Sequence, residues 1–177
     1  MHPETPEEAG ERLAAFRELL KRLKDHDVEF IVIGGLAAIL QGAPVATYDV
    51  DVCAPMSDDN VAKIHAALRD IRPRFRFRPD KLPVPDDPAR LRGIRNMNLV
   101  TDVGVIDLLG ELPGVGTFEE VRDRTVEINM GGFVCRVLNL ETLILSKKTA
   151  GRDKDLISVR HLEAILRKQQ REPGLFD

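Results

Sequence analysis

The 177-residue chain has no tryptophan, two cysteines and no long uninterrupted apolar run. Cys53 and Cys135 lie far apart and outside a Cys-x-x-Cys spacing, which argues against a disulfide framework or a structural zinc site. Without a run of about 20 apolar residues, we expect no membrane-spanning helix. The polar, acidic stretch 1–11 is unlike a signal peptide, so we expect a cytoplasmic protein that does not contact a membrane.

Hydrophobic residues make up 43% of the chain, enough for a core, and the length fits one domain over 1–177. Within it we expect a core at about 28–137 and a helical part at about 139–170. A net charge of −3 gives no overall nucleic-acid footprint. The basic residues nevertheless crowd the middle of the chain: Arg69, Arg72, Arg74, Arg76, Arg78, Lys81, Arg90, Arg92 and Arg95.

Hydrophobic periodicity and capping residues predict alternating helices and strands. Thr5-Pro6-Glu7-Glu8 is a capping box that begins a helix ending near Asp25. Further helices are expected at 36–41, 58–71, 118–122, 140–150 and 153–168. Strands are expected at 28–33, 46–53, 74–78, 94–101, 103–109, 125–129 and 133–137, with a tight turn at 102–104. Arginine alternates with phenylalanine over 74–78, so as a strand this segment would put three guanidinium groups on one face. This order favours an α/β (α+β) fold with a small mixed sheet flanked by helices, closed by the C-terminal helices.

Two aspartates alternate along the strand predicted at 46–53. Asp49 and Asp51 are two residues apart, so on a strand their carboxylates would project from the same face. Two like charges this close repel each other and resist removal from water. A divalent cation would relieve the repulsion, and Mg²⁺ or Mn²⁺ is the ion that hard carboxylate oxygens suit. The alternative is a pair of solvated or turn-capping carboxylates.

A glycine pair ends the preceding strand. Gly34-Gly35 between a strand and a helix leaves backbone N–H groups that could bind a phosphate. Such a turn can equally be needed for packing alone.

Four features follow one another in this part of the chain: a strand, Gly34-Gly35, a short helix and Thr47-x-Asp49-x-Asp51. In this order they resemble the polymerase-β-like nucleotidyltransferase superfamily, and most closely its small bacterial members. The resemblance implies that Asp49 and Asp51 bind the metals that carry a nucleoside triphosphate. Asp107, a lone acid in the strand predicted at 103–109, matches the third carboxylate of that superfamily. Its alternative is an acid at a strand edge that reaches solvent.

The C-terminal stretch resembles the helical tail of nucleotidyltransferase-like toxins from abortive-infection and toxin–antitoxin systems, through Glu141 to Lys147 and Arg152 to Asp155. Lys147 continues the apolar stripe of its helix and should point inward, where it needs an anion. That anion could be a triphosphate, an active-site aspartate or Asp155, the last as a salt bridge between two helices.

Three positions depart from the resembled pattern. Gly35 stands where many superfamily members have serine, so a phosphate contact there must come from the backbone. Val45 stands where the toxin-like members often carry arginine, and Ser158 where an acid is usual. These departures bear on activity more than on fold.

The resemblance implies transfer of a nucleoside monophosphate from an NTP to an acceptor hydroxyl, with pyrophosphate released. Asp49 and Asp51 would hold two metal ions, and Asp107 would ligate the second and orient or deprotonate the acceptor. The nucleotide would be bound by Gly34, Gly35, Thr47 and Lys147.

The acceptor could be tRNA, a partner protein or a small molecule such as an antibiotic. The arginine cluster favours RNA, unless it is only a solvated surface. A toxin with a cognate antitoxin is compatible with transfer. The contrasting hypothesis is a catalytically silent module that binds a nucleotide or a partner protein.

Overall fold

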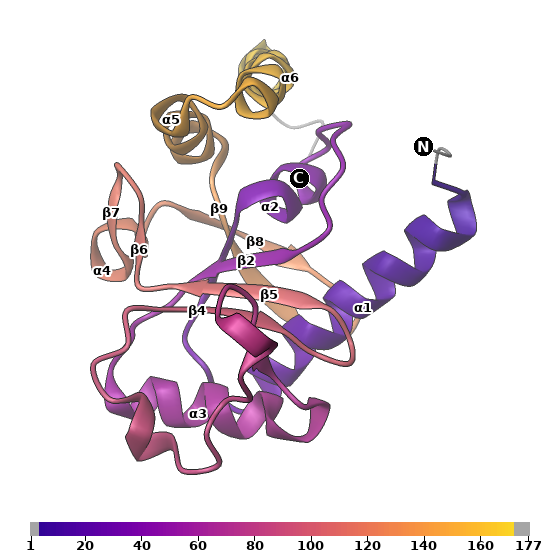
Figure 1. Ribbon diagram of the computed structural model, residues 1–177. Helices are drawn as coiled ribbons and strands as arrows, with labels where there is room; N and C mark the ends of the chain where they lie inside the picture. The colour runs from indigo at the N-terminus through magenta and orange to yellow at the C-terminus, as the bar shows by residue number, and fades with distance from the viewer. Residues whose placement is uncertain (1–3, 172–177) are drawn as a thin grey trace.

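A mixed seven-stranded β-sheet forms the centre of the computed structural model, which describes residues 4–171 (Figure 1). The strand order is β3-β4-β5-β2-β1-β9-β8. Residues 1–3 and 172–177, which begin and end the expected domain and include the start of the acidic N-terminal stretch, lie outside the described range. The strands are β1 Ile31–Ile33, β2 Val50–Cys53, β3 Arg74–Phe75, β4 Asn96–Val100, β5 Val105–Leu109, β8 Thr125–Asn129 and β9 Val134–Leu138.

Helices cover both faces of this sheet. Figure 1 shows α1 and α3 on one side, and α2, α5 and α6 on the other. A small hairpin and a short helix precede β8. The helices are α1 Pro6–Asp25, α2 Gly34–Leu40, α3 Asp58–Leu68, α4 Phe118–Val121, α5 Leu140–Ala150 and α6 Asp153–Arg171, and the hairpin strands are β6 Glu111–Leu112 and β7 Gly116–Thr117. The expected α/β fold with a mixed sheet and C-terminal helices is confirmed.

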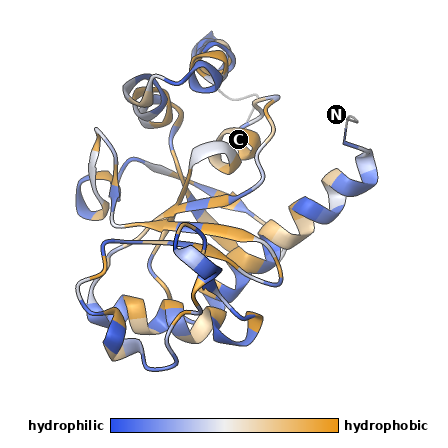
Figure 2. Ribbon diagram, in the orientation of Figure 1, coloured by the Kyte–Doolittle hydropathy of each residue, from blue (hydrophilic) through white to orange (hydrophobic). Residues whose placement is uncertain are grey.

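The first helix begins where its capping box predicts. The Thr5 hydroxyl accepts a hydrogen bond from the Glu8 N–H, and the Glu8 carboxylate accepts one from the Thr5 N–H. One face of the helix is buried and the other is solvated, as the amphipathic pattern predicts. Figure 2 shows the same division across the molecule, with hydrophobic residues along the central strands. The buried residues of α1 are Phe16, Leu19, Leu20 and Leu23.

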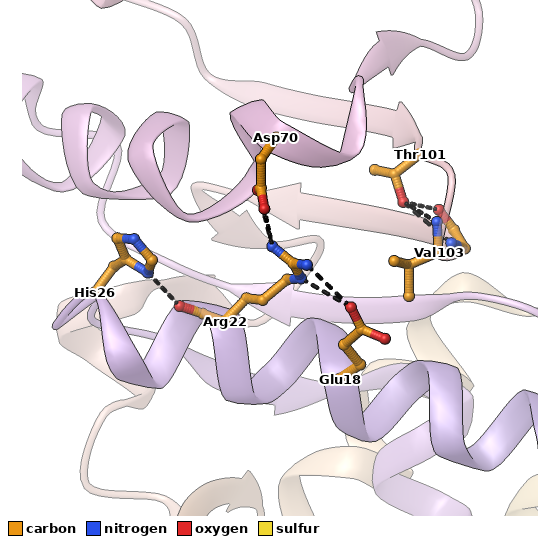
Figure 3. Close-up of polar contacts among 7 residues, drawn as sticks. Glu18, Arg22, His26, Asp70, Thr101 and Val103 are labelled. Carbon is orange, nitrogen blue, oxygen red and sulfur yellow. Dashed lines mark hydrogen bonds and ion pairs between the residues drawn. The ribbon is translucent and has the colours of Figure 1, made fainter.

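A polar contact joins α1 to the 3-10 turn Arg69–Ile71 that follows α3. Arg22 donates two hydrogen bonds to Asp70, at 2.8 and 2.9 Å, and also pairs with Glu18 one turn earlier (Figure 3).

The Thr101 hydroxyl accepts hydrogen bonds from the N–H groups of Val103 and Gly104, which closes the turn between β4 and β5. The tight turn predicted between these strands is therefore confirmed.

The register of the two central strands sorts their side chains into two layers. β2 and β5 are parallel, with Asp51 beside Asp107 and Val52 beside Leu108. Successive side chains point to opposite faces, so the valine and leucine enter the core while both aspartates face α2 and α5. The apolar residues anchor the strands, and the same register places two carboxylates side by side.

The strand expected over 46–53 begins only at Val50, so the prediction that Thr47 and Asp49 lie on it is wrong. The pairing with both neighbouring strands stops here: Ile33, the last residue of β1, pairs with Asp51, and the first pair with β5 joins Val50 to Ile106. Residues before Val50 therefore have no ladder partner.

The strand expected over 74–78 is also shorter, spanning only Arg74–Phe75. Pro79 has no N–H for a ladder and opens a 3-10 turn, Pro79–Lys81. Arg76 and Arg78 thus lie beyond the strand, and the predicted single face of three guanidinium groups does not form.

None of the helices between residues 4 and 171 is both long and apolar enough to cross a membrane.

Truncating the core beneath the aspartates should cost stability. Leu108 is fully buried next to Asp107, so Leu108→Ala should lower the free energy of unfolding by about 2–5 kcal/mol through lost burial and a cavity. Urea unfolding measures the change. Leu145→Ala is the control, because Leu145 is 46% exposed and its loss should cost less than about 0.5 kcal/mol. Equal losses for both variants would contradict the assigned core.

Candidate active site

Three carboxylates converge beside the glycine turn. Asp51 lies on β2, Asp107 on β5, and Asp49 directly before β2; one oxygen of each lies within 4.8 Å of the others. The parallel register places the first two together, and the bend before β2 brings the third. The structure thus brings together the three aspartates named from the sequence.

Gly34 allows this approach. Its φ of +66° is in the left-handed region, and a Cβ there would overlap the carboxylate of Asp51. A Cβ on Gly35 would lie 2.6 Å from the Cβ of Thr47. Serine therefore does not fit at position 35 in this arrangement, which gives a steric reason for that departure from the resembled pattern.

Thr47 is buried and oriented toward the first aspartate. Its hydroxyl donates to Oδ1 of Asp49 at 3.1 Å, and its side chain fills the space over Gly35. Thr47 therefore fixes Asp49, although Asp49 is outside the regular strand.

Arg76 is the site residue that sequence reasoning missed. Its Nη2 donates to Oδ2 of Asp107 at 2.6 Å, and its Nη1 lies 3.5 Å from Oδ2 of Asp49. The alternation of 74–78 had assigned it to a basic strand face. The only sequence signal for the position of Arg76 is that three clustered aspartates require a cation nearby.

Burial and mutual repulsion raise the pKa of two carboxyl groups. Loss of hydration, followed by the charges of Asp49 and Asp107, raises the pKa of Asp51 to about 7. Burial also raises the pKa of Asp107, against the lowering effects of Asn98 and Arg76. Oδ1 of Asp107 is buried without a hydrogen bond of normal geometry within the described chain, although the Asn98 amide is near.

A second charged cluster lies where α5 meets α6. Lys147 is buried, as its apolar stripe predicts, and its Nζ lies 3.4 Å from Oδ1 of Asp155. Arg152 donates to the other oxygen of Asp155 at 2.6 Å. Burial opposes ionisation of Asp155, but Arg152 and Lys147 outweigh it and lower its pKa. Of the anions considered for Lys147, the structure shows Asp155.

One cavity of about 800 Å³ joins these parts. The glycine turn, the three aspartates, Arg76, Lys147 and Arg152 all line it. Val45 and Ser158 line it too, and the Ser158 hydroxyl donates to the Lys154 carbonyl within α6. The cavity therefore has an acidic part and a basic part, a combination that suits a polyanion carried with a cation.

A family model described as "Nucleotidyltransferase of unknown function" (DUF6036) matches residues 11–168. The chain belongs to this family. The superfamily and the enzyme class expected from the motifs are thereby confirmed. Among curated proteins the comparison found no match.

Two solved structures share the fold of this family member. One is the lincosamide antibiotic adenylyltransferase LnuA in its lincomycin-bound form: 15% identity, a TM-score of 0.61, and coverage of 86% of this chain and 96% of that chain. The other is a protein of Thermotoga maritima assigned as a nucleotidyltransferase (TM1012): 19% identity, a TM-score of 0.55, and coverage of 90% and 94%. Similarity at these identities concerns the fold.

The donor set fits a hard divalent cation. It offers only carboxylate oxygens, one of them the buried Oδ1 of Asp107 near the Asn98 amide, and the carboxylate of Asp51 has no hydrogen bond or ion pair within the described chain. A raised pKa at Asp51 is the expected mark of a charge that lacks its counter-ion.

In the metal-free protein, the stability that the protonated Asp51 contributes should be lost as the pH rises. The folded-state pKa of Asp51, about 7, exceeds the ordinary value of 3.8, so the fold binds this proton more tightly than the unfolded chain. The proton's stabilising effect is complete below about pH 4 and is lost by about pH 7. Asp51→Asn should therefore raise the melting temperature by about 2–4 °C at pH 8, a gain of about 1 kcal/mol, and by less than half as much at pH 5.

Thermal unfolding in a chelator, at both pH values, measures this effect. The matched control is Asp123→Asn, which changes an exposed aspartate and should shift neither melting temperature. A large fall in stability for Asp51→Asn would instead show that Asp51 is a structural ion-pair partner.

Proposed function

We propose that this protein is a metal-dependent nucleotidyltransferase that moves a nucleoside monophosphate from an NTP to an acceptor hydroxyl. The observation that carries the proposal is the convergence of Asp49, Asp51 and Asp107 in a cavity also lined by Lys147. Family membership supports the reaction class. The contrasting hypothesis, a catalytically silent binding module, predicts no turnover of triphosphate.

Asp49, Asp51 and Asp107 would hold Mg²⁺ or Mn²⁺. When bound, such an ion offsets charge on the phosphates and lowers the pKa of a hydroxyl. Thr47 keeps the Asp49 carboxylate oriented through its hydrogen bond. Gly34 and Gly35 line the same cavity as the aspartates, so their backbone N–H groups are the proposed contacts for phosphate oxygens. Lys147, held at the cavity by Asp155, would offset charge on the leaving group.

The bonding changes follow from this placement. The acceptor oxygen forms a bond to the α-phosphorus while the bond from that phosphorus to the bridging oxygen of the β-phosphate breaks. Pyrophosphate leaves with its charge offset by Lys147. The hydroxyl proton leaves as that bond forms, and Asp107 is the residue that would orient or deprotonate the acceptor.

The geometry favours a small-molecule hydroxyl as acceptor. The predicted arginine face, the main argument for RNA, does not form, because Arg76 pairs with aspartates and the Arg78 guanidinium lies over the Phe75 ring. Arg72 and Arg92 are also paired with acids. Apolar residues line the cavity beside the charged groups, among them Pro44, Val45, Phe77, Leu112 and Ile157. The fold relative LnuA was solved with lincomycin, a small molecule.

Transfer should require each aspartate. With labelled triphosphates, Mg²⁺ and a panel of hydroxyl-bearing antibiotics, the wild-type chain should transfer label and release pyrophosphate. Asp49→Asn, Asp51→Asn and Asp107→Asn should each lower the rate by about 10³-fold or more, the scale typical of lost metal ligands and bases. Asp123→Asn should retain full activity. Full activity of the three site variants would remove the proposed mechanism.

RNA should bind weakly, and without a dependence on the middle arginines. If RNA were the acceptor, each phosphate contact would make affinity fall steeply with salt. We expect the double variant Arg78→Glu and Arg90→Glu to bind a tRNA mixture as the wild type does, at low and at moderate salt, since neither residue lies in the 800 Å³ cavity. A clear loss of affinity in this variant, together with labelled tRNA, would make RNA the acceptor.

A further inference from the structure

The Arg76 guanidinium occupies the place where a cation would join two of the three aspartates. It lies between Oδ2 of Asp107, at 2.6 Å, and Oδ2 of Asp49, at 3.5 Å. Arg76 makes no hydrogen bond to the carboxylate of Asp51 or to Oδ1 of Asp107, and the neighbour of Oδ1 of Asp107 is the neutral Asn98 amide. The cluster is thus divided into a part that already has a cation and a part that lacks one.

Arg76 is held there by more than its charge. Its backbone N–H donates to the Asn98 carbonyl at 2.9 Å, directly after the last residue of β3, so the residue is fixed to the sheet. Its guanidinium also lies 4.5 Å from the centre of the Phe77 ring. A guanidinium stays charged at any ordinary pH and binds carboxylates with fixed geometry. These features make it a permanent cation of the cluster.

The net charge of the three aspartates and Arg76 matches that of one divalent ion. Three ionised aspartates carry three negative charges, and Arg76 balances one of them. The two that remain match the charge of a single Mg²⁺ or Mn²⁺. A second such ion would share the cluster with the Arg76 guanidinium, and its charge would exceed what the three carboxylates can balance.

We propose that Arg76 replaces the second metal ion, so that this nucleotidyltransferase binds a single divalent cation in its active site. The inference rests on the proposed function and revises the expectation of two ions. Arg76 acts as a positioning residue: its guanidinium keeps the carboxylates of Asp107 and Asp49 together. Asp51 and Asp107 would hold the single ion, with Asp49 beside them.

Counting bound Mn²⁺ tests this inference without measuring activity. Purified protein is titrated with Mn²⁺ alone, and the free ion is followed by electron paramagnetic resonance. The wild type should bind one ion, and Arg76→Met should bind two, because the carboxylates of Asp49 and Asp107 are then free. Arg76→Gln serves as a second, polar replacement. The matched control is Arg78→Met, which removes the neighbouring arginine that lies over Phe75 and should leave one ion bound.

The outcomes separate the two proposals. Two ions in the wild type, or one ion in both folded Arg76 variants, would overturn the role of Arg76 and leave the proposed transferase standing. No Mn²⁺ binding to any variant, or binding unchanged by Asp51→Asn, would overturn the proposed metal site itself. Near-ultraviolet circular dichroism of each variant shows whether it is folded.

Discussion

The repulsion among Asp49, Asp51 and Asp107 is the constraint on which the rest of the site depends. Three carboxylates within 4.8 Å of one another are unfavourable in a partly buried cavity unless cations compensate them. The chain supplies Arg76 directly and Lys147 at longer range, and the charges of both lower the pKa of Asp51, yet that pKa is still raised to about 7. The protein alone therefore does not complete the neutralisation.

The register of the sheet brings these charges together, and the burial of its apolar side chains compensates the repulsion. Parallel pairing of β2 with β5 places Asp51 beside Asp107, while the valine and leucine residues of the same strands are buried on the opposite face. Burial of those apolar side chains stabilises the register by more than the neighbouring charges oppose it. The substrate-facing layer can thus hold unfavourable groups because the layer towards α1 and α3 is a conventional core.

The sequence was most informative where a local pattern determines structure. Capping residues and apolar periodicity predicted α1, α5 and the central strands, and the spacing of Gly34-Gly35 and the aspartates predicted the superfamily. Strand ends were predicted less well, because they depend on where neighbouring strands stop. Arg76 was misplaced for the same reason: its alternation with phenylalanine is local, whereas its pairing with Asp107 depends on a turn at Pro79 and on the sheet register.

The contact between Gly35 and Thr47 limits how this site can vary. The turn and the segment before Asp49 pass so close that only one of them has room for a side chain, and here the threonine fills it. The hydroxyl next to Asp49 therefore comes from position 47 and not from position 35. A relative with serine at the position of Gly35 must carry a smaller residue opposite it or hold the two segments farther apart, so substitutions at these two positions should be coupled.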